Sequence, residues 1–386
     1  MSSLFFSTPL SREELTVRVR PRENDVRGAF FRDTTAIIHS NPFRRLKHKT
    51  QVFFTPQNDH ICTRIEHVLH VASVAATICR SLNLDADMAW AIGLGHDLGH
   101  TPFGHVGEKI VEEIMAAPFA HELYSLRVVD KLINHGRGLN LTYAVRDGIV
   151  NHCGEQFEQA IVPDFDLKDL SAINARNRYP ATWEGCVVRM SDKIAYLGRD
   201  FEDAVKLRIL SRNSLPMDVI NLLGSSNGEI IDSLVNDIIQ SSLKTGTIGF
   251  SRPVYEALIS FKNFNYSHIY RHELLSEYHT YFRRILFTLF TYLTELHTRF
   301  GTEYHRYPDE GNTLAARFGE YLSKMKELYT SEGASSSTMA IDYIAGMTDD
   351  FALDAVSEIM VPKHFESKFD TLLFERRREF DKPGRD

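Results

Sequence analysis

Residues 93–108 read GLGHDLGHTPFGHVGE, and this stretch decides how the rest of the chain is interpreted. It holds three histidines, an aspartate and a glutamate, punctuated by glycines. Core packing is a poor explanation for so many ionisable groups, because a buried charge needs a partner. Clustered histidines and acids of this kind indicate a functional site.

Two residues outside this stretch complete a metal-binding pattern. His67 precedes the adjacent pair His96 and Asp97, and Asp192 lies far downstream. Imidazole and carboxylate together form a ligand set suited to a divalent first-row metal such as Mn, Fe, Co, Ni or Zn. A His-Asp pair alone is weak evidence in a chain with 17 histidines and 51 acids, so the prediction depends on the surrounding sequence.

The hydrophobic pattern predicts helices around these residues. After His67, apolar residues recur at i, i+3 and i+4 as far as Leu82, which is typical of an amphipathic helix. Asp85 or Asp87 is expected to cap the next helix, which would end near Gly95 and leave the His-Asp pair at its C-terminal end. A third helix is expected from about Val106.

Strand alternation is scarce, so the fold class predicted is all-α with at most minor β-hairpins. A short strand at residues 17–20 and a small hairpin near residues 246–250 are the segments with some strand character. Residues 1–330 are expected to form the core, with an excursion loop at about 154–182. Residues 331–386 are expected to form a C-terminal helical segment packed on the core, with a frayed tail.

Composition excludes several classes of protein. The 386 residues are 43% hydrophobic and 25% charged, as in soluble globular proteins, and the net charge of −7 argues against a nucleic-acid coat protein. No apolar run approaches the length of a membrane helix, and the N-terminus lacks a secretory signal. The four cysteines form no CxxC pair, so neither a zinc ribbon nor a disulfide framework is indicated. A cytoplasmic protein is expected, and DNA binding is left open.

The segment that contains Asp192 carries further polar groups. Asp192, Tyr196 and Asp200 are spaced i, i+4 and i+8, so they share one helix face. This face is either solvated or supplied with partners, because two carboxylates and a phenol are costly to bury alone. A metal for Asp192 and a polar substrate for Tyr196 and Asp200 would be such partners.

Five blocks occur in an order that resembles the HD-domain deoxyguanosinetriphosphate triphosphohydrolase family. They are residues 41–53, 63–67, 95–108, 191–196 and 342–349, within a resemblance from about residue 20 to 350. The resemblance implies a helical HD fold and hydrolysis of a deoxynucleoside triphosphate (dNTP) to deoxynucleoside and inorganic triphosphate. It implies Mn or Mg as the first choice of metal, a homo-oligomer such as a hexamer, and a nucleotide activator at a second site.

The resemblance also implies roles for individual residues. The metal ligands would be His67, His96, Asp97 and Asp192; the catalytic residues His105, Glu108 and His121; and the substrate-binding residues Gln51, Arg64, Lys193, Tyr196 and Asp200. The i, i+3 spacing of His105 and Glu108 lets the carboxylate orient the imidazole. Whether His105 or His121 donates the proton stays open.

The sequence differs from the family pattern at one place, and two alternative functions stay open. Residues 119–122 read FAHE and lack the asparagine of many bacterial members, so a strict preference for dGTP does not transfer. In the first alternative, the chain is a different HD phosphohydrolase that acts on nucleoside monophosphates or cyclic nucleotides. In the second, it is a non-catalytic member that senses nucleotides or binds DNA. Arg64, Lys193 and Tyr196 favour a triphosphate substrate, and the intact ligand set argues against a non-catalytic role.

Overall fold

The computed structural model describes residues 6–23, 25–54, 58–153, 157–173 and 178–361, and it is helical almost throughout. The prediction of an all-α fold is therefore confirmed. The helices are α1 (Arg12–Thr16), α2 (Ala29–Ile38), α3 (Asn41–Arg45), α4 (Arg64–Ser81), α5 (Ala86–Gly95), α6 (Gly104–Met115), α7 (His121–Arg127), α8 (Tyr143–Val150), α9 (Trp183–Lys206), α10 (Met217–Leu222), α11 (Asn227–Thr245), α12 (Arg252–Asn265), α13 (Glu273–Phe300), α14 (Thr313–Lys324), α15 (Lys326–Glu332), α16 (Ser336–Ala345) and α17 (Asp349–Met360). Short 3-10 or π turns cover Leu46–His48, Val128–Leu132, Leu170–Ala172, Arg212–Ser214, Tyr266–Tyr270 and Tyr304–Glu310.

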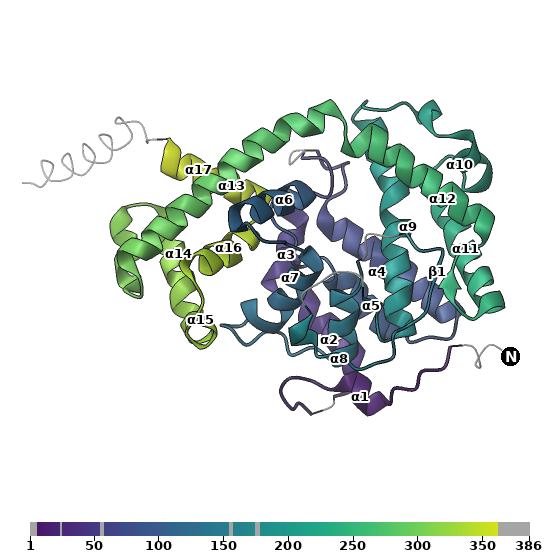
Figure 1. The fold of residues 1–386 in the computed structure, drawn as a ribbon, viewed down its shortest axis with the longest axis horizontal. Helices are drawn as coiled ribbons and strands as arrows, with labels where there is room; N and C mark the ends of the chain where they lie inside the picture. The colour runs from purple at the N-terminus through teal and green to yellow at the C-terminus, as the bar shows by residue number, and fades with distance from the viewer. Residues whose placement is uncertain (1–5, 24, 55–57, 154–156, 174–177, 362–386) are drawn as a thin grey trace, which may run out of the picture.

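Helices α4, α5 and α9 pack on one another at the centre of the molecule, with α2 and α8 beside α5 (Figure 1). Helix α4 begins with a capping box between Thr63 and Glu66. Of the two predicted caps, Asp85 is the one that caps α5, and its side chain accepts hydrogen bonds from the backbone of the first turn. The two helices approach closely at Gly93, where a Cβ would lie 2.7 Å from the Ala72 Cα. This packing directs the C-terminal end of α5 toward α4 and α9.

The turn after α5 is held against α7. A Cβ on Gly99 would lie 2.2 Å from the Ser125 nitrogen, so only glycine fits this approach. The Ser125 hydroxyl accepts from the Gly99 nitrogen (2.8 Å) and donates to the His96 carbonyl (2.6 Å). Helix α6 then begins at Gly104, slightly before the expected start, after Phe103 in the left-handed conformation with φ of 65°.

The minor strands differ from the prediction. Strand β2 (Ile248–Gly249) pairs antiparallel with β1 (Ala160–Ile161) rather than folding back on itself. Gly246 ends α11 in the left-handed conformation and turns the chain toward the predicted excursion segment, which supplies the partner strand. Around residues 17–20 the structure has a single bridge between Arg18 and Thr142, and no strand is assigned there.

The C-terminal helices form a second hydrophobic cluster. This cluster draws its buried residues from α13 through α17 and also takes in Phe103 and Ile110 at α6. The long helix α13 contacts α6, α16 and α17, and Figure 1 shows it running across one side of the molecule. The predicted boundary near residue 330 stays a prediction, and the predicted tail at 362–386 lies outside the described residues. In the described part of the chain, no helix combines the length and apolarity that crossing a membrane requires.

Candidate metal centre and active site

The four predicted metal ligands come together from three helices. His67 lies in the first turn of α4, His96 and Asp97 directly follow α5, and Asp192 lies on α9. The His67 Nε2 is 3.0 Å from the Asp192 Oδ1, and the His96 Nε2 is 3.4 Å from the Asp97 Oδ1. The separations from His67 to Asp97 and from His96 to Asp192 are 3.8 Å and 3.9 Å. The four side chains therefore converge on one point.

The state of His96 fits a bound cation at this point. Its Nδ1 donates to the Gly93 carbonyl at 2.7 Å, so in the neutral ring the Nε2 is left as an acceptor. This Nε2 is buried and has no hydrogen-bond partner among the described residues. A buried acceptor that faces two carboxylates needs a positive partner, which a divalent ion supplies.

Asp97 contacts several residues of the site, because its two carboxylate oxygens face different partners. The Oδ2 lies 2.5 Å from the Arg64 guanidinium, and the Oδ1 lies 3.2 Å from the His100 Nε2. Arg64 is buried and also donates to the backbone carbonyls of Thr50 (3.2 Å) and Gln51 (3.4 Å). Arg64 thus fixes the loop before α4 to the ligand pair.

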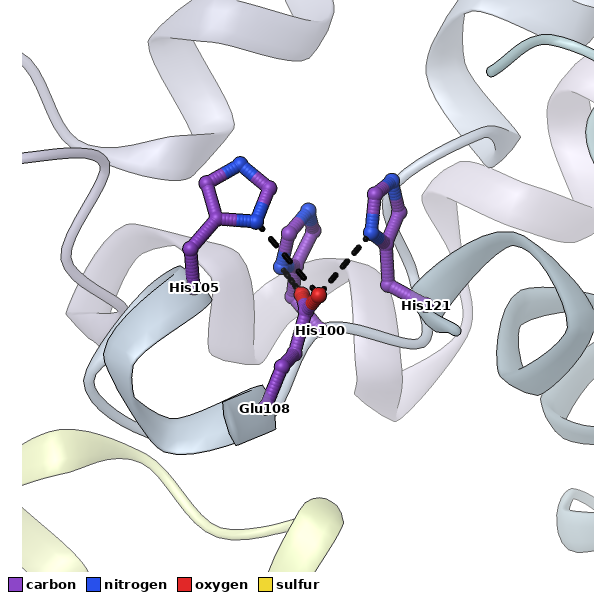
Figure 2. A group of neighbouring side chains, drawn as sticks. All are labelled: His100, His105, Glu108 and His121. Carbon is purple, nitrogen blue, oxygen red and sulfur yellow. Dashed lines mark hydrogen bonds and ion pairs between the residues drawn. The ribbon is translucent and has the colours of Figure 1, made fainter. Parts of the chain in front are cut away.

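Glu108 gathers three histidines (Figure 2). Its Oε2 is 3.4 Å from the His105 Nδ1 and 3.2 Å from the His121 Nδ1, while its Oε1 contacts the His100 Nδ1. Figure 2 shows that each ring turns one nitrogen toward Glu108 and the other away. His105, Glu108 and His121 are the predicted catalytic residues, and His100 is the fourth member of this cluster.

The two expected catalytic histidines differ in their surroundings. The His105 side chain is 63% exposed, whereas that of His121 is 5% exposed and stacks on His100 with ring centroids 3.9 Å apart. Burial acts to lower the pKa of His121, but the Glu108 carboxylate and the Cys153 thiol outweigh it and raise the pKa well above its usual value. Glu108 and Cys153 therefore favour the protonated form of His121.

A cavity of about 790 Å³ connects the metal ligands with the expected substrate-binding residues. All five of these residues line it: Gln51, Arg64, Lys193, Tyr196 and Asp200. Asp192, Tyr196 and Asp200 share one face of α9, as their spacing predicted. Lys109 adds a cation to the lining that the sequence analysis did not identify.

Two expected substrate-binding residues have protein partners. The Lys193 Nζ lies 2.5 Å from Glu158, whose other oxygen lies 2.6 Å from Arg189. The Tyr270 hydroxyl donates to Asp200 at 2.6 Å. Burial raises the pKa of Asp200 to about 7, although the Tyr270 hydrogen bond acts in the opposite direction. Asp200 therefore changes charge near neutral pH.

Sequence reasoning missed several residues that shape the site. His100 stands inside the decisive motif, and its spacing of three from Asp97 was an available signal. His152 and Cys153 follow α8, line the cavity and carry no motif of their own. Asp349 begins α17, and its carboxylate accepts from the Thr50 nitrogen (2.8 Å) and the Phe103 nitrogen (2.9 Å). Asp349 thereby joins the loops before α4 and α6 to the C-terminal helices.

Comparisons with known proteins agree with this geometry. The HD domain matches residues 64–197, which include all four predicted metal ligands, and a phosphohydrolase-associated domain matches residues 248–358. A deoxyguanosinetriphosphate triphosphohydrolase-like protein of Caldanaerobacter subterraneus is 38% identical, with 92% of each chain covered. Proteins of the same description from Clostridium tetani (89% of each chain covered) and Desulfatibacillum aliphaticivorans (87% of this chain and 89% of the relative) are each 36% identical. The chain belongs to the HD-domain phosphohydrolases, in the family of deoxyguanosinetriphosphate triphosphohydrolase-like proteins.

Proposed function

We propose that this metal-dependent phosphohydrolase converts dNTPs to deoxynucleoside and inorganic triphosphate. One observation carries the proposal: three of the four predicted metal ligands and the three histidines around Glu108 line the same cavity as three cations, Arg64, Lys109 and Lys193. A triphosphate carries several negative charges and requires several donors, which a monophosphate does not. The relatives are described as deoxyguanosinetriphosphate triphosphohydrolase-like proteins, which supports the same substrate class.

The ligand set has a defined chemical task in this proposal. His67, His96, Asp97 and Asp192 would hold a divalent ion, for which Mn or Mg is our first choice. When bound, such an ion polarises a phosphoryl oxygen and lowers the pKa of water. Arg64, which lies beside Asp97, would contact the phosphates. Lys193 would leave its ion pair with Glu158 and bind a phosphate of the substrate instead.

We assign the proton donor to His105. Cleavage between the α-phosphorus and the 5′ oxygen expels an alkoxide, which needs a proton as it leaves. Glu108 holds the Nδ1 of His105, and the exposed ring turns its other nitrogen away from Glu108 (Figure 2). The His121 Nε2 instead faces Asp97 at 3.8 Å, on the side of the metal ligands. His121 would then offset charge on the phosphates rather than protonate the leaving group.

Tyr196 and Asp200 are assigned to the sugar end of the cavity. Tyr196 lies one turn beyond Asp192 on α9, where its ring can pack on the pentose and crowd a 2′-hydroxyl. The buried Gln51 Oε1 has no hydrogen-bond partner among the described residues and offers an acceptor to the nucleoside. The expected homo-oligomer and nucleotide activator stay predictions of the resemblance.

An isotope-labelling experiment that identifies the cleaved bond tests the proposal. Purified protein is incubated with Mn and each dNTP in oxygen-18 water, and the products are separated by chromatography. Attack at the α-phosphorus places the label in inorganic triphosphate, with unlabelled deoxynucleoside as co-product. Stepwise release of dNDP or dNMP, or label in the 5′-hydroxyl, would refute it. Turnover of nucleoside monophosphates or cyclic nucleotides alone would favour the other class of HD phosphohydrolase.

Two histidine variants test the assignment of His105 as the proton donor. His105→Ala should keep its metal and lose turnover by roughly 100- to 10,000-fold, the usual contribution of a general acid. His60→Ala is the matched control, because His60 is exposed and does not line the cavity. Normal turnover by His105→Ala with full metal content would transfer the donor role to His121.

A further inference from the structure

A carboxylate of the excursion segment holds two basic side chains of α9. The Glu158 Oε2 lies 2.5 Å from the Lys193 Nζ, and its Oε1 lies 2.6 Å from an Arg189 guanidinium nitrogen. Arg189 and Lys193 stand one helical turn apart, and both side chains are buried. Burial acts to raise the pKa of Glu158, but the two cations outweigh it and hold the pKa below its usual value. Glu158 is therefore ionised at neutral pH and offsets part of the positive charge on α9.

The backbone on both sides of Glu158 is anchored. The Phe157 carbonyl accepts from the Tyr255 hydroxyl of α12 at 2.7 Å. The Gln159 carbonyl accepts from the Phe250 nitrogen at 2.9 Å, and strand β1 begins at the next residue and pairs with β2. Because its neighbours are held in this way, the carboxylate of Glu158 stays close to the two cations, and only the side chain can change position.

The two cations differ in their other surroundings. Arg189 also donates to the backbone carbonyls of Asn151 (3.0 Å) and Cys153 (2.6 Å), which fix its guanidinium. Lys193 lines the cavity. A ligand that enters the cavity therefore reaches the Lys193 ammonium, and it meets Glu158 as a negative group already bound there.

We propose that Glu158 is an internal competitor for the phosphate site at Lys193, which a ligand displaces only when it is anchored at a second point in the cavity. The inference rests on the phosphate-binding role of Lys193 in the proposed function. An isolated phosphate has to replace the Glu158 contact without other gains. A triphosphate that Arg64 already holds presents its remaining phosphates to Lys193 at a high effective concentration. Glu158 would thus select polyphosphates and return to Lys193 as inorganic triphosphate leaves.

Binding of inorganic phosphates tests the proposal without turnover. Purified full-length protein, dialysed to remove unbound metal, is titrated in a calorimeter with inorganic triphosphate and, separately, with orthophosphate. Glu158→Gln should bind triphosphate roughly 10- to 100-fold more tightly than wild-type protein, the equivalent of one hydrogen bond to a charged group. Its affinity for orthophosphate should also rise. Unchanged or weaker triphosphate binding would overturn the proposal, because a residue that only positions Lys193 gives that result. Wild-type protein that binds orthophosphate as tightly as Glu158→Gln would exclude the selection of polyphosphates.

A double-mutant cycle shows whether Glu158 acts through Lys193. In Lys193→Met protein, the further change Glu158→Gln should not tighten triphosphate binding, because the contested cation is gone. Equal tightening with and without Lys193 would contradict the competition and indicate a general charge effect.

Two further variants control for charge and for folding. Glu256→Gln is the matched control, because Glu256 is exposed and pairs with Arg252 within α12. It should leave both affinities unchanged, and tightening equal to that of Glu158→Gln would contradict the assignment. Glu158→Asp serves if Glu158→Gln fails to fold. Its side chain is shorter on the anchored backbone and cannot hold both cations, so it should also tighten triphosphate binding, and an unchanged affinity would overturn the proposal.

Failure of this inference and failure of the proposed function give different results. Weaker triphosphate binding by Lys193→Met, with unchanged binding by Glu158→Gln, would overturn the competition and leave Lys193 as a phosphate ligand. Tightening by Glu158→Gln that requires Lys193, in a protein without dNTP turnover, would contradict the proposed reaction and leave the competition intact.

Discussion

The Ser125 hydroxyl holds the turn that carries two of the predicted metal ligands, so Ser125→Ala should weaken both the fold and metal binding. Ser125 is fully buried. Its Oγ accepts from the Gly99 nitrogen at 2.8 Å and donates to the His96 carbonyl at 2.6 Å. Alanine removes both hydrogen bonds and leaves two backbone groups buried without these partners. The His96–Asp97 pair then loses the contact that fixes it against α7.

The size of the effect follows from these two groups. A buried polar group left without its partner costs about 1–3 kcal/mol, so the free energy of unfolding should fall by roughly 2–6 kcal/mol. Ser191→Ala is the matched control on α9. Ser191 is equally buried, but its Oγ has no hydrogen-bond partner among the described residues. Removing an unpaired buried hydroxyl should change stability by less than about 1 kcal/mol, and in the favourable direction.

Urea unfolding followed by circular dichroism measures the difference, and elemental analysis after dialysis against a weak chelator measures metal retention. We expect Ser125→Ala to unfold at lower urea and to retain less metal than Ser191→Ala. Equal unfolding midpoints for the two variants, or full metal retention by Ser125→Ala, would refute the role given to this hydroxyl.

Three further predictions concern the ion, the sugar and a buried lysine. Asp97→Ala should lose the metal and activity with helical content preserved; full occupancy by elemental analysis would remove Asp97 from the ligand set. Wild-type protein should prefer dGTP to GTP, and Tyr196→Ala should narrow that preference; equal wild-type rates would exclude a sugar-selecting role. Burial lowers the pKa of Lys49 from 10.5 to about 7 in the folded protein. Between pH 7 and 10.5 the unfolded chain therefore binds more protons than the folded protein, so the contribution of Lys49 to the free energy of unfolding rises as the pH rises. Urea unfolding between pH 7 and 10 should show wild-type protein gaining stability relative to Lys49→Met, and parallel pH profiles would contradict this.

Local sequence determined the elements that carry the site. The helical spacing after His67, the cap at Asp85 and the glycines around His96 predicted α4, α5 and the position of the His-Asp pair. The i, i+4, i+8 spacing on α9 likewise predicted that Asp192, Tyr196 and Asp200 share a face. Helical periodicity and capping depend on residues within a few positions of one another, so they can be inferred from sequence alone.

Contacts between distant segments depended on tertiary packing. The excursion segment supplies Glu158 to Lys193 and strand β1 to β2, and neither pairing has a local signal. Asp349 reaches Thr50 and Phe103 only because α17 packs beside the loops that precede α4 and α6. Membership of a known family implied that distant ligands converge, but it did not show which other donors would join them.

The cluster of His121, His152 and Cys153 shows this limit most clearly. His121 begins α7, whereas His152 and Cys153 follow α8, and no motif spacing links the two segments in the sequence. Their ligand atoms meet because α7 and α8 pack together beside the end of α5. Sequence alone determined which helices form and which residues share a helix face. Only the packing of those helices decided that His121 and His152 would face Asp97, because side chains far apart in the chain meet through the burial of apolar surfaces rather than through local periodicity.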